Sequence, residues 1–121
     1  MSNVKVQRTN SDILRVVTTT IQQKLGNDAL VGVHVLGVDT SSDFSVARIS
    51  VEIPGDDAAK RRGIQELERA SGFIRNEIAS RVQLRQTPQL RFILDRGAEN
   101  ASRVEELLQQ IGKGTERSED E

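Results

Sequence analysis

The sequence offers few side chains that could carry out catalysis. Its 121 residues include one histidine and no cysteine, which excludes thiolate metal sites, cysteine nucleophiles and any site built on two histidines. His34 stands among valines in a strand-like segment, which favours a structural or incidental role. Asp56 and Asp57 are adjacent carboxylates, but they directly precede a helical pattern, where a carboxylate caps the helix. We therefore expect a protein that is not an enzyme and that holds no metal and no cofactor.

The basic side chains point instead to phosphate. The net charge is −1, yet residues 60–96 carry nine basic side chains and four acidic ones, whereas residues 99–121 carry three and seven. A local basic field of this kind attracts phosphate even when the whole chain is nearly neutral. The alternative interpretation of the same charges is an ordinary solvated helix surface. With three phenylalanines and no Trp or Tyr, stacking of successive bases on a row of aromatic side chains is not expected.

The elements that position these charges begin with a helix. Thr9 and Asp12 have the spacing of a capping box, so the helix is predicted to start at residue 9, behind a flexible arm of residues 1–8. An apolar stripe at every fourth position then continues for about four turns. The stripe consists of Ile13, Val17, Ile21 and Leu25. Gly26 and Asn27 are a typical end for such a helix.

Three β-strands are predicted from alternating apolar residues. The first covers residues 31–39, with a shift of phase at Gly37 that indicates a bulge. The second carries Ala47, Ile49, Val51 and Ile53 on one face. The short link between them predicts an antiparallel hairpin. Pro88 opens the third strand, in which Leu90, Phe92 and Leu94 share one face.

Two helical patterns lie between the second and third strands. The first runs through Ile64 and Leu67 to Ala70, and the second runs from Phe73 to Val82. Between them, Ser71 and Gly72 predict a kink or tight joint at which the two helices approach closely. This order of elements indicates an α+β fold with helices on one face of a three-stranded sheet.

The C-terminal region contains one more helical pattern. Ser102 and Glu105 fit a capping box, and the apolar spacing predicts a helix that ends near residue 111. Its apolar positions are Val104, Leu107, Leu108 and Ile111. Residues 112–121 contain no apolar side chain suited to a core, so they are predicted to form a disordered acidic tail.

Two sequence blocks carry a resemblance to a known family. They are Ala70-Ser71-Gly72-Phe73-Ile74-Arg75 and the stretch of residues 84–92, LRQTPQLRF. The sequence resembles the bacterial ribosome-binding factor A family over roughly residues 6–111. Arg8-Thr9 at the first helix, the strand pair with Ser42-Asp43-Phe44 at its turn, and the closing Arg103–Leu108 stretch also match.

This resemblance implies a fold and a function. The fold is a single K-homology-like domain of the prokaryotic type over residues 9–111, in which an Ala-x-Gly kink, here at residues 70–72, replaces the usual Gly-x-x-Gly loop. The function is that of a cytoplasmic, monomeric factor that binds the free 30S ribosomal subunit. It would assist late maturation of 16S rRNA near the 5′-terminal helix of that RNA, with no membrane and no small-molecule substrate involved.

A helix that begins at the kink would direct its N–H groups outward, which favours phosphate. The candidate RNA contacts are Lys5, Arg8, Arg69, Ala70, Ser71, Gly72, Arg75, Arg81 and Arg85. The alternative is a small protein-interaction domain that makes no direct RNA contact. In that case the sheet face or the last helix would dock a partner, and the basic residues would only be solvated.

Overall fold

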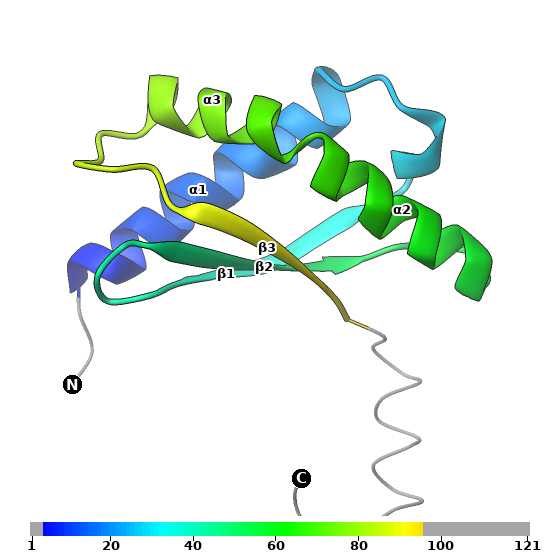
Figure 1. Ribbon diagram of the computed structural model, residues 1–121, viewed down its shortest axis with the longest axis horizontal. Coiled ribbons are helices and arrows are strands. Elements are labelled where there is room, and N and C mark those ends of the chain that lie inside the picture. The colour runs from blue at the N-terminus through cyan, green and yellow to red at the C-terminus, as the bar shows by residue number, and fades with distance from the viewer. Residues whose placement is uncertain (1–3, 96–121) are drawn as a thin grey trace, which may run out of the picture.

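The computed structural model describes residues 4–95 and shows two layers, one of helices and one of strands (Figure 1). In chain order the elements are α1 (Val4–Gln23), the short 3₁₀ helix η1 (Asp28–Leu30), β1 (His34–Thr40), β2 (Val46–Glu52), α2 (Asp57–Arg69), α3 (Ser71–Arg81) and β3 (Gln89–Leu94). The predicted α+β class is confirmed. The expected helix over 102–111 and the expected tail lie outside the described residues. Within residues 4–95, no helix is long and apolar enough to cross a membrane.

The sheet has the order β1-β2-β3, so β2 is central. β1 and β2 form the predicted antiparallel hairpin, and their register shifts between Val35 and Gly37, where the sequence predicted a bulge. β2 and β3 are parallel and are connected through α2 and α3. The inward side chains of β2, including Ile49 and Val51, are fully buried beneath the helices, as the alternation predicted.

The first helix begins earlier than the sequence indicated. α1 starts at Val4, so residues 4–8 are helical and the prediction of a flexible arm is wrong for them. Thr9 is not a cap but a buried residue inside the helix, with 5% of its surface exposed. Contacts with distant residues accompany these early turns: Asn10 Oδ1 accepts a hydrogen bond of 2.9 Å from the Thr40 N–H, and Lys5 Nζ lies 6.0 Å from the ring centroid of Phe44.

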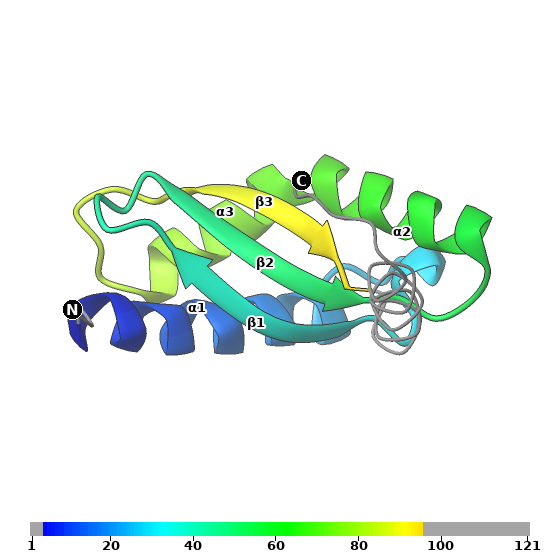
Figure 2. The same ribbon diagram turned by 90° about the horizontal axis from the view of Figure 1, so that it is seen from below.

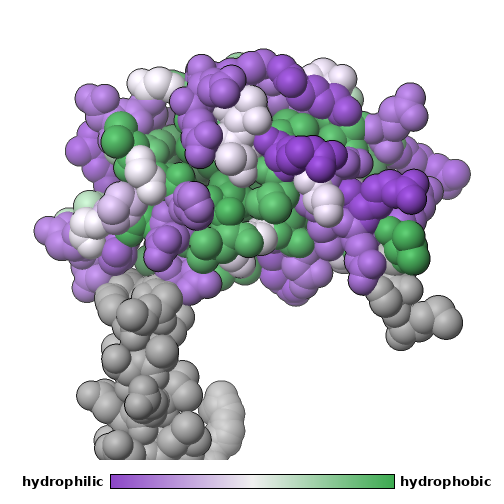
Figure 3. Space-filling model, turned by 180° about the vertical axis from the view of Figure 1, so that it is seen from behind, coloured by the Kyte–Doolittle hydropathy of each residue, from purple (hydrophilic) through white to green (hydrophobic). Residues whose placement is uncertain are grey.

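Apolar side chains gather on the side of the molecule formed by α1 and β1, where polar side chains surround them (Figure 3). On this side the core is not completely closed, because Val35 and Val38 of β1 are only partly buried. The centre of the core is fully covered: Ile13 and Val17 of α1 have no exposed surface. The apolar stripe predicted for this helix is thus its buried face.

Close packing between helix and sheet occurs at Gly63 and not at Gly72. A Cβ atom added to Gly63 of α2 would lie 2.8 Å from Ile53 Cδ1 and 3.1 Å from Ile53 Cγ2. A Cβ atom added to Gly72 would meet no atom of residues 4–95 within 4 Å, and Gly72 lies in the first turn of α3 without a positive φ. The prediction that the two helices approach closely at Gly72 is therefore wrong, because Gly72 is an ordinary helical residue of α3.

Candidate nucleic-acid interface

The joint between α2 and α3 is a single residue. Ala70 has φ −85° and ψ 0° and serves as the C-cap of α2 and the N-cap of α3. Its N–H donates to the Glu66 C=O and its C=O accepts from the Ile74 N–H, both at 3.0 Å. The sequence placed the interruption across residues 70–72, but Ser71 and Gly72 already belong to α3.

The N-terminal end of α3 is suited to an anion. The first N–H groups of a helix have no acceptor within the helix and carry a partial positive charge, and no side chain of residues 4–95 caps this end of α3. Arg69 stands beside it with 80% of its side chain exposed, 3.8 Å from Glu66 at the nearest N and O atoms. Phe73 is 45% exposed in the same turn. Residues 69–73 thus combine a cation, open main chain and an aromatic ring, and we call them the joint surface.

Arg75 is differently engaged. Its Nε donates to the Pro88 C=O at 3.0 Å and its Nη2 donates to the Thr87 C=O at 2.8 Å. The side chain thereby ties α3 to the residues that lead into β3, and Arg75 is half-buried. The sequence grouped Arg75 with the RNA contacts, whereas in the structure two of its guanidinium nitrogens bind the main chain of the domain itself.

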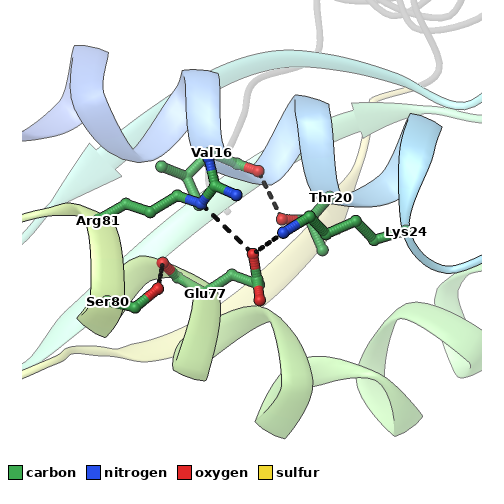
Figure 4. Close-up of polar contacts among 6 residues, drawn as sticks. All are labelled: Val16, Thr20, Lys24, Glu77, Ser80 and Arg81. Carbon is green, nitrogen blue, oxygen red and sulfur yellow. Dashed lines mark hydrogen bonds and ion pairs between the residues drawn. The ribbon is translucent and has the colours of Figure 1, made fainter.

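Arg81 also has a partner within the domain (Figure 4). Its Nε lies 3.4 Å from Glu77 Oε1, four residues earlier on α3, and Lys24 Nζ lies 2.7 Å from the same oxygen. The hydrogen bond from Lys24 is the main cause that lowers the pKa of Glu77, and the charges of Lys24 and Arg81 add to it. Glu77 thus offsets part of the positive charge near the end of α3.

Three further candidates lie at one end of the molecule. There the first turns of α1, the β1–β2 loop and the α3–β3 loop come together, at the left of Figure 1. Lys5, Arg8 and Arg85 belong to these segments and are exposed. We call these three residues the end surface. The structure therefore places some candidates at this end and others at the joint surface, while Arg75 and Arg81 belong to neither surface.

Two loop residues support the end surface. Gln86 Nε2 contacts the Asp43 and Phe44 carbonyl oxygens at 3.3 and 3.4 Å, which joins the two loops. Phe44 has a positive φ of 62°, and Asp43 accepts hydrogen bonds from Ser45 and Ser41 that lower its pKa. The sequence showed Phe44 only as part of a matching block, because its neighbours come from distant segments.

Comparison with known proteins identifies the family. The family model described as ribosome-binding factor A matches residues 5–108. The chain belongs to the ribosome-binding factor A family. It is 34% identical to ribosome-binding factor A of Rhodopirellula baltica, over all of this chain and 88% of that protein. The corresponding protein of Syntrophomonas wolfei is 31% identical, over 92% of this chain and 93% of that protein.

Solved structures of ribosome-binding factor A share the fold. The crystal structure of the factor from Thermus thermophilus has a TM-score of 0.67 and 26% identity, over 74% of this chain and 94% of that one. The NMR structure of a Thermotoga maritima protein named as a putative ribosome-binding factor A gives 0.68 and 26%, over 80% and 93%. A homology model of the Thermus thermophilus factor, fitted into a cryo-EM map of its complex with the 30S subunit, gives 0.60 and 28%, over 73% and 92%.

Proposed function

We propose that this protein binds the free 30S ribosomal subunit in the cytoplasm and assists late maturation of 16S rRNA near the 5′-terminal helix of that RNA. It acts as a monomer and without catalysis. Membership of the ribosome-binding factor A family and the 30S complex of the Thermus thermophilus factor support binding to the subunit. The observation that carries the RNA contact is the uncapped N-terminal end of α3 beside the exposed Arg69.

The joint surface can hold one stretch of RNA backbone. Main-chain N–H groups and an arginine are the groups that proteins commonly use on phosphate oxygens. Gly72 matters here because the described part of the chain places no atom within 4 Å of a Cβ atom added to it, so a phosphate can approach the main chain. Phe73, 45% exposed in the same turn, can stack on an unpaired base. The glycine thus serves the ligand and not the packing of the two helices.

The end surface supplies a second contact. Lys5 and Arg8 on α1 and Arg85 before β3 are exposed and lie apart from the joint in the fold. Arg75 and Arg81 contribute less in this proposal, because both already bind groups of the domain. Two separated basic surfaces are better suited to contact two parts of a folded rRNA than to follow one continuous single strand of RNA.

The first test is where the protein travels when ribosomal particles are separated on a gradient. We expect it to comigrate with free 30S subunits and to be absent from translating ribosomes. A protein that stays in the unbound pool under all growth conditions would contradict the proposal.

The second test measures binding to 30S subunits at several salt concentrations. Each phosphate contact releases counterions, so we expect Arg69→Ala to weaken binding and to flatten the salt slope by about 0.7–0.9. Arg61→Ala removes the same charge from an exposed position on α2, about two turns from the joint, and should leave the slope unchanged. Binding of the unaltered protein with little salt dependence would favour docking through protein contacts.

A further inference from the structure

The outer face of the sheet is left uncovered by residues 4–95, since α1, α2 and α3 all lie on the other face (Figures 1 and 2). The strand register places Gly37, Ser50 and Ile93 in one row across the three strands. Leu36 is the extra residue of the bulge beside Gly37. Leu36 is 45% exposed and Ile93 is 42% exposed.

This row is about as wide as one helix and could bind one. Leu36 and Ile93 stand on the two edge strands, and only a glycine and a serine lie between them. Two spacings between neighbouring strands amount to about 10 Å, close to the diameter of a helix with its side chains. A helix laid over Ser50 would therefore contact both apolar side chains.

The next row on the same face is basic. It contains Asp39, Arg48 and Arg91, paired in register. Asp39 and Arg48 are 3.7 Å apart at their nearest charged atoms, and both side chains are largely exposed. Arg91 takes part in none of the ion pairs formed within residues 4–95. Two arginines side by side on neighbouring strands repel each other, so a negative group above them would be favoured.

The chain itself has a segment with matching properties. Twenty-six residues follow Asp95. Asp95 lies just past the end of β3, where its N–H donates to the Val51 C=O at 2.8 Å. The apolar side chains of 102–111 recur with helical spacing, and residues 99–121 carry seven acidic and three basic side chains. Six linking residues can reach about 20 Å, and a helix of ten residues is about 15 Å long, which fits within the face.

We propose that residues 102–111 pack as a helix on the outer face of the sheet, with Leu107 and Leu108 seated between Leu36 and Ile93. The helix runs back from the end of β3 toward the basic row. Its C-terminal end, which carries a partial negative charge, and the acidic residues after it then face Arg48 and Arg91. This arrangement closes the outer face and keeps these two arginines from RNA, so that RNA contact is confined to the joint and end surfaces.

Disulfide trapping tests the position of the segment, because the chain has no cysteine of its own. Ser50→Cys combined with Leu108→Cys places two thiols face to face in the proposed arrangement. Ser50→Cys combined with Gln109→Cys directs the second thiol to the opposite side of the helix. Since a disulfide needs Cα atoms within about 7 Å, we expect the first pair to close within one chain at least about tenfold faster. Equal rates, or bonds that form only between chains and faster at higher protein concentration, would overturn the proposal.

A second measurement uses the full chain without cysteines. Leu108→Asp should lower the unfolding midpoint and speed amide hydrogen exchange along β3, because a carboxylate cannot be buried between Leu36 and Ile93. Gln109→Asp adds the same charge one residue further along and should leave both measurements at the values of the unaltered protein. If the two variants gave equal midpoints and equal exchange, the segment would not be seated on the sheet.

Discussion

Lys24, just past the end of α1, and Glu77 in the middle of α3 join the two helices through a contact of 2.7 Å between Nζ and Oε1. The same oxygen lies 3.4 Å from Arg81 Nε, and only 19% of the Glu77 side chain is exposed. One carboxylate thus holds two cations from separate elements. This arrangement fixes α3, and with it the joint surface, against α1.

The first prediction concerns acid. Because the folded protein lowers the pKa of Glu77 below its ordinary value of 4.5, this carboxylate stabilises the fold fully above that value and loses its effect as the pH falls through the folded pKa. Glu77→Gln should therefore be less stable than the unaltered protein at pH 7, and the difference in unfolding midpoint should shrink as the pH is lowered below about 4. Glu68→Gln, at an exposed position of α2, is the control. A difference that is the same at every pH would mean that Glu77 acts through packing.

The parts of the fold that could be predicted from the sequence depend on local patterns. The alternation in β2, the bulge at Gly37 and the carboxylate of Asp56 that accepts from the Ala59 N–H all follow from residues a few positions apart. The capping box at Thr9 is also a local pattern, but it predicted the wrong start for the first helix. There the burial of Thr9 and the hydrogen bond that Asn10 accepts from the Thr40 N–H show that tertiary contacts set the conformation.

The candidate site was harder to predict, because the partners of its arginines are distant in sequence. Nothing about Arg75 indicates that the carbonyl groups of Thr87 and Pro88 will stand within reach. Lys24 and Glu77 are 53 residues apart, so only the pair on α3 itself could be anticipated. The sequence indicated an interruption here because a serine and a glycine stand between two helical patterns, but the role proposed for Gly72 depends on the open space that residues 4–95 leave around it.

Arg75 should prove to be a structural residue. Removing it leaves two carbonyl oxygens without charged donors, and a hydrogen bond from a charged group contributes roughly 1.5–3 kcal/mol. We expect Arg75→Ala to lower the free energy of unfolding by about 2 kcal/mol, measured by denaturant titration. Arg69→Ala, which removes an arginine with 80% of its side chain exposed, should change it by no more than about 0.5 kcal/mol. Equal stabilities of the two variants would mean that Arg75 does not stabilise the fold and remains a candidate for RNA contact.

The same substitution at the two helical glycines should lower the stability of the fold at Gly63 but not at Gly72. Gly63→Val forces side-chain atoms against Ile53, which is only 2% exposed, and overpacking of this kind typically costs about 1–3 kcal/mol. Gly72→Val meets space left open by residues 4–95 in a helical turn, where valine is no worse than glycine, so its free energy of unfolding should stay within about 0.5 kcal/mol of the original value. Gly72→Val should nevertheless weaken binding to the 30S subunit, because it covers main chain that a phosphate would approach. A large loss of stability at Gly72 would restore the close-packed joint that the sequence suggested.

The final prediction separates stacking from charge at the joint surface. Phe73 is 45% exposed in the first turn of α3, so Phe73→Leu keeps an apolar side chain there and should leave the unfolding midpoint nearly unchanged. If the ring stacks on an unpaired base, its loss should weaken 30S binding by about 1–3 kcal/mol without changing the salt slope, since no phosphate contact is lost. Arg69→Ala should change both the affinity and the slope. Val31→Ala, at an apolar position that is 71% exposed and lies outside the joint surface, controls for a general loss of exposed apolar surface. Binding by Phe73→Leu that equals that of Val31→Ala would exclude stacking and leave the joint as a contact made by charge and main chain alone.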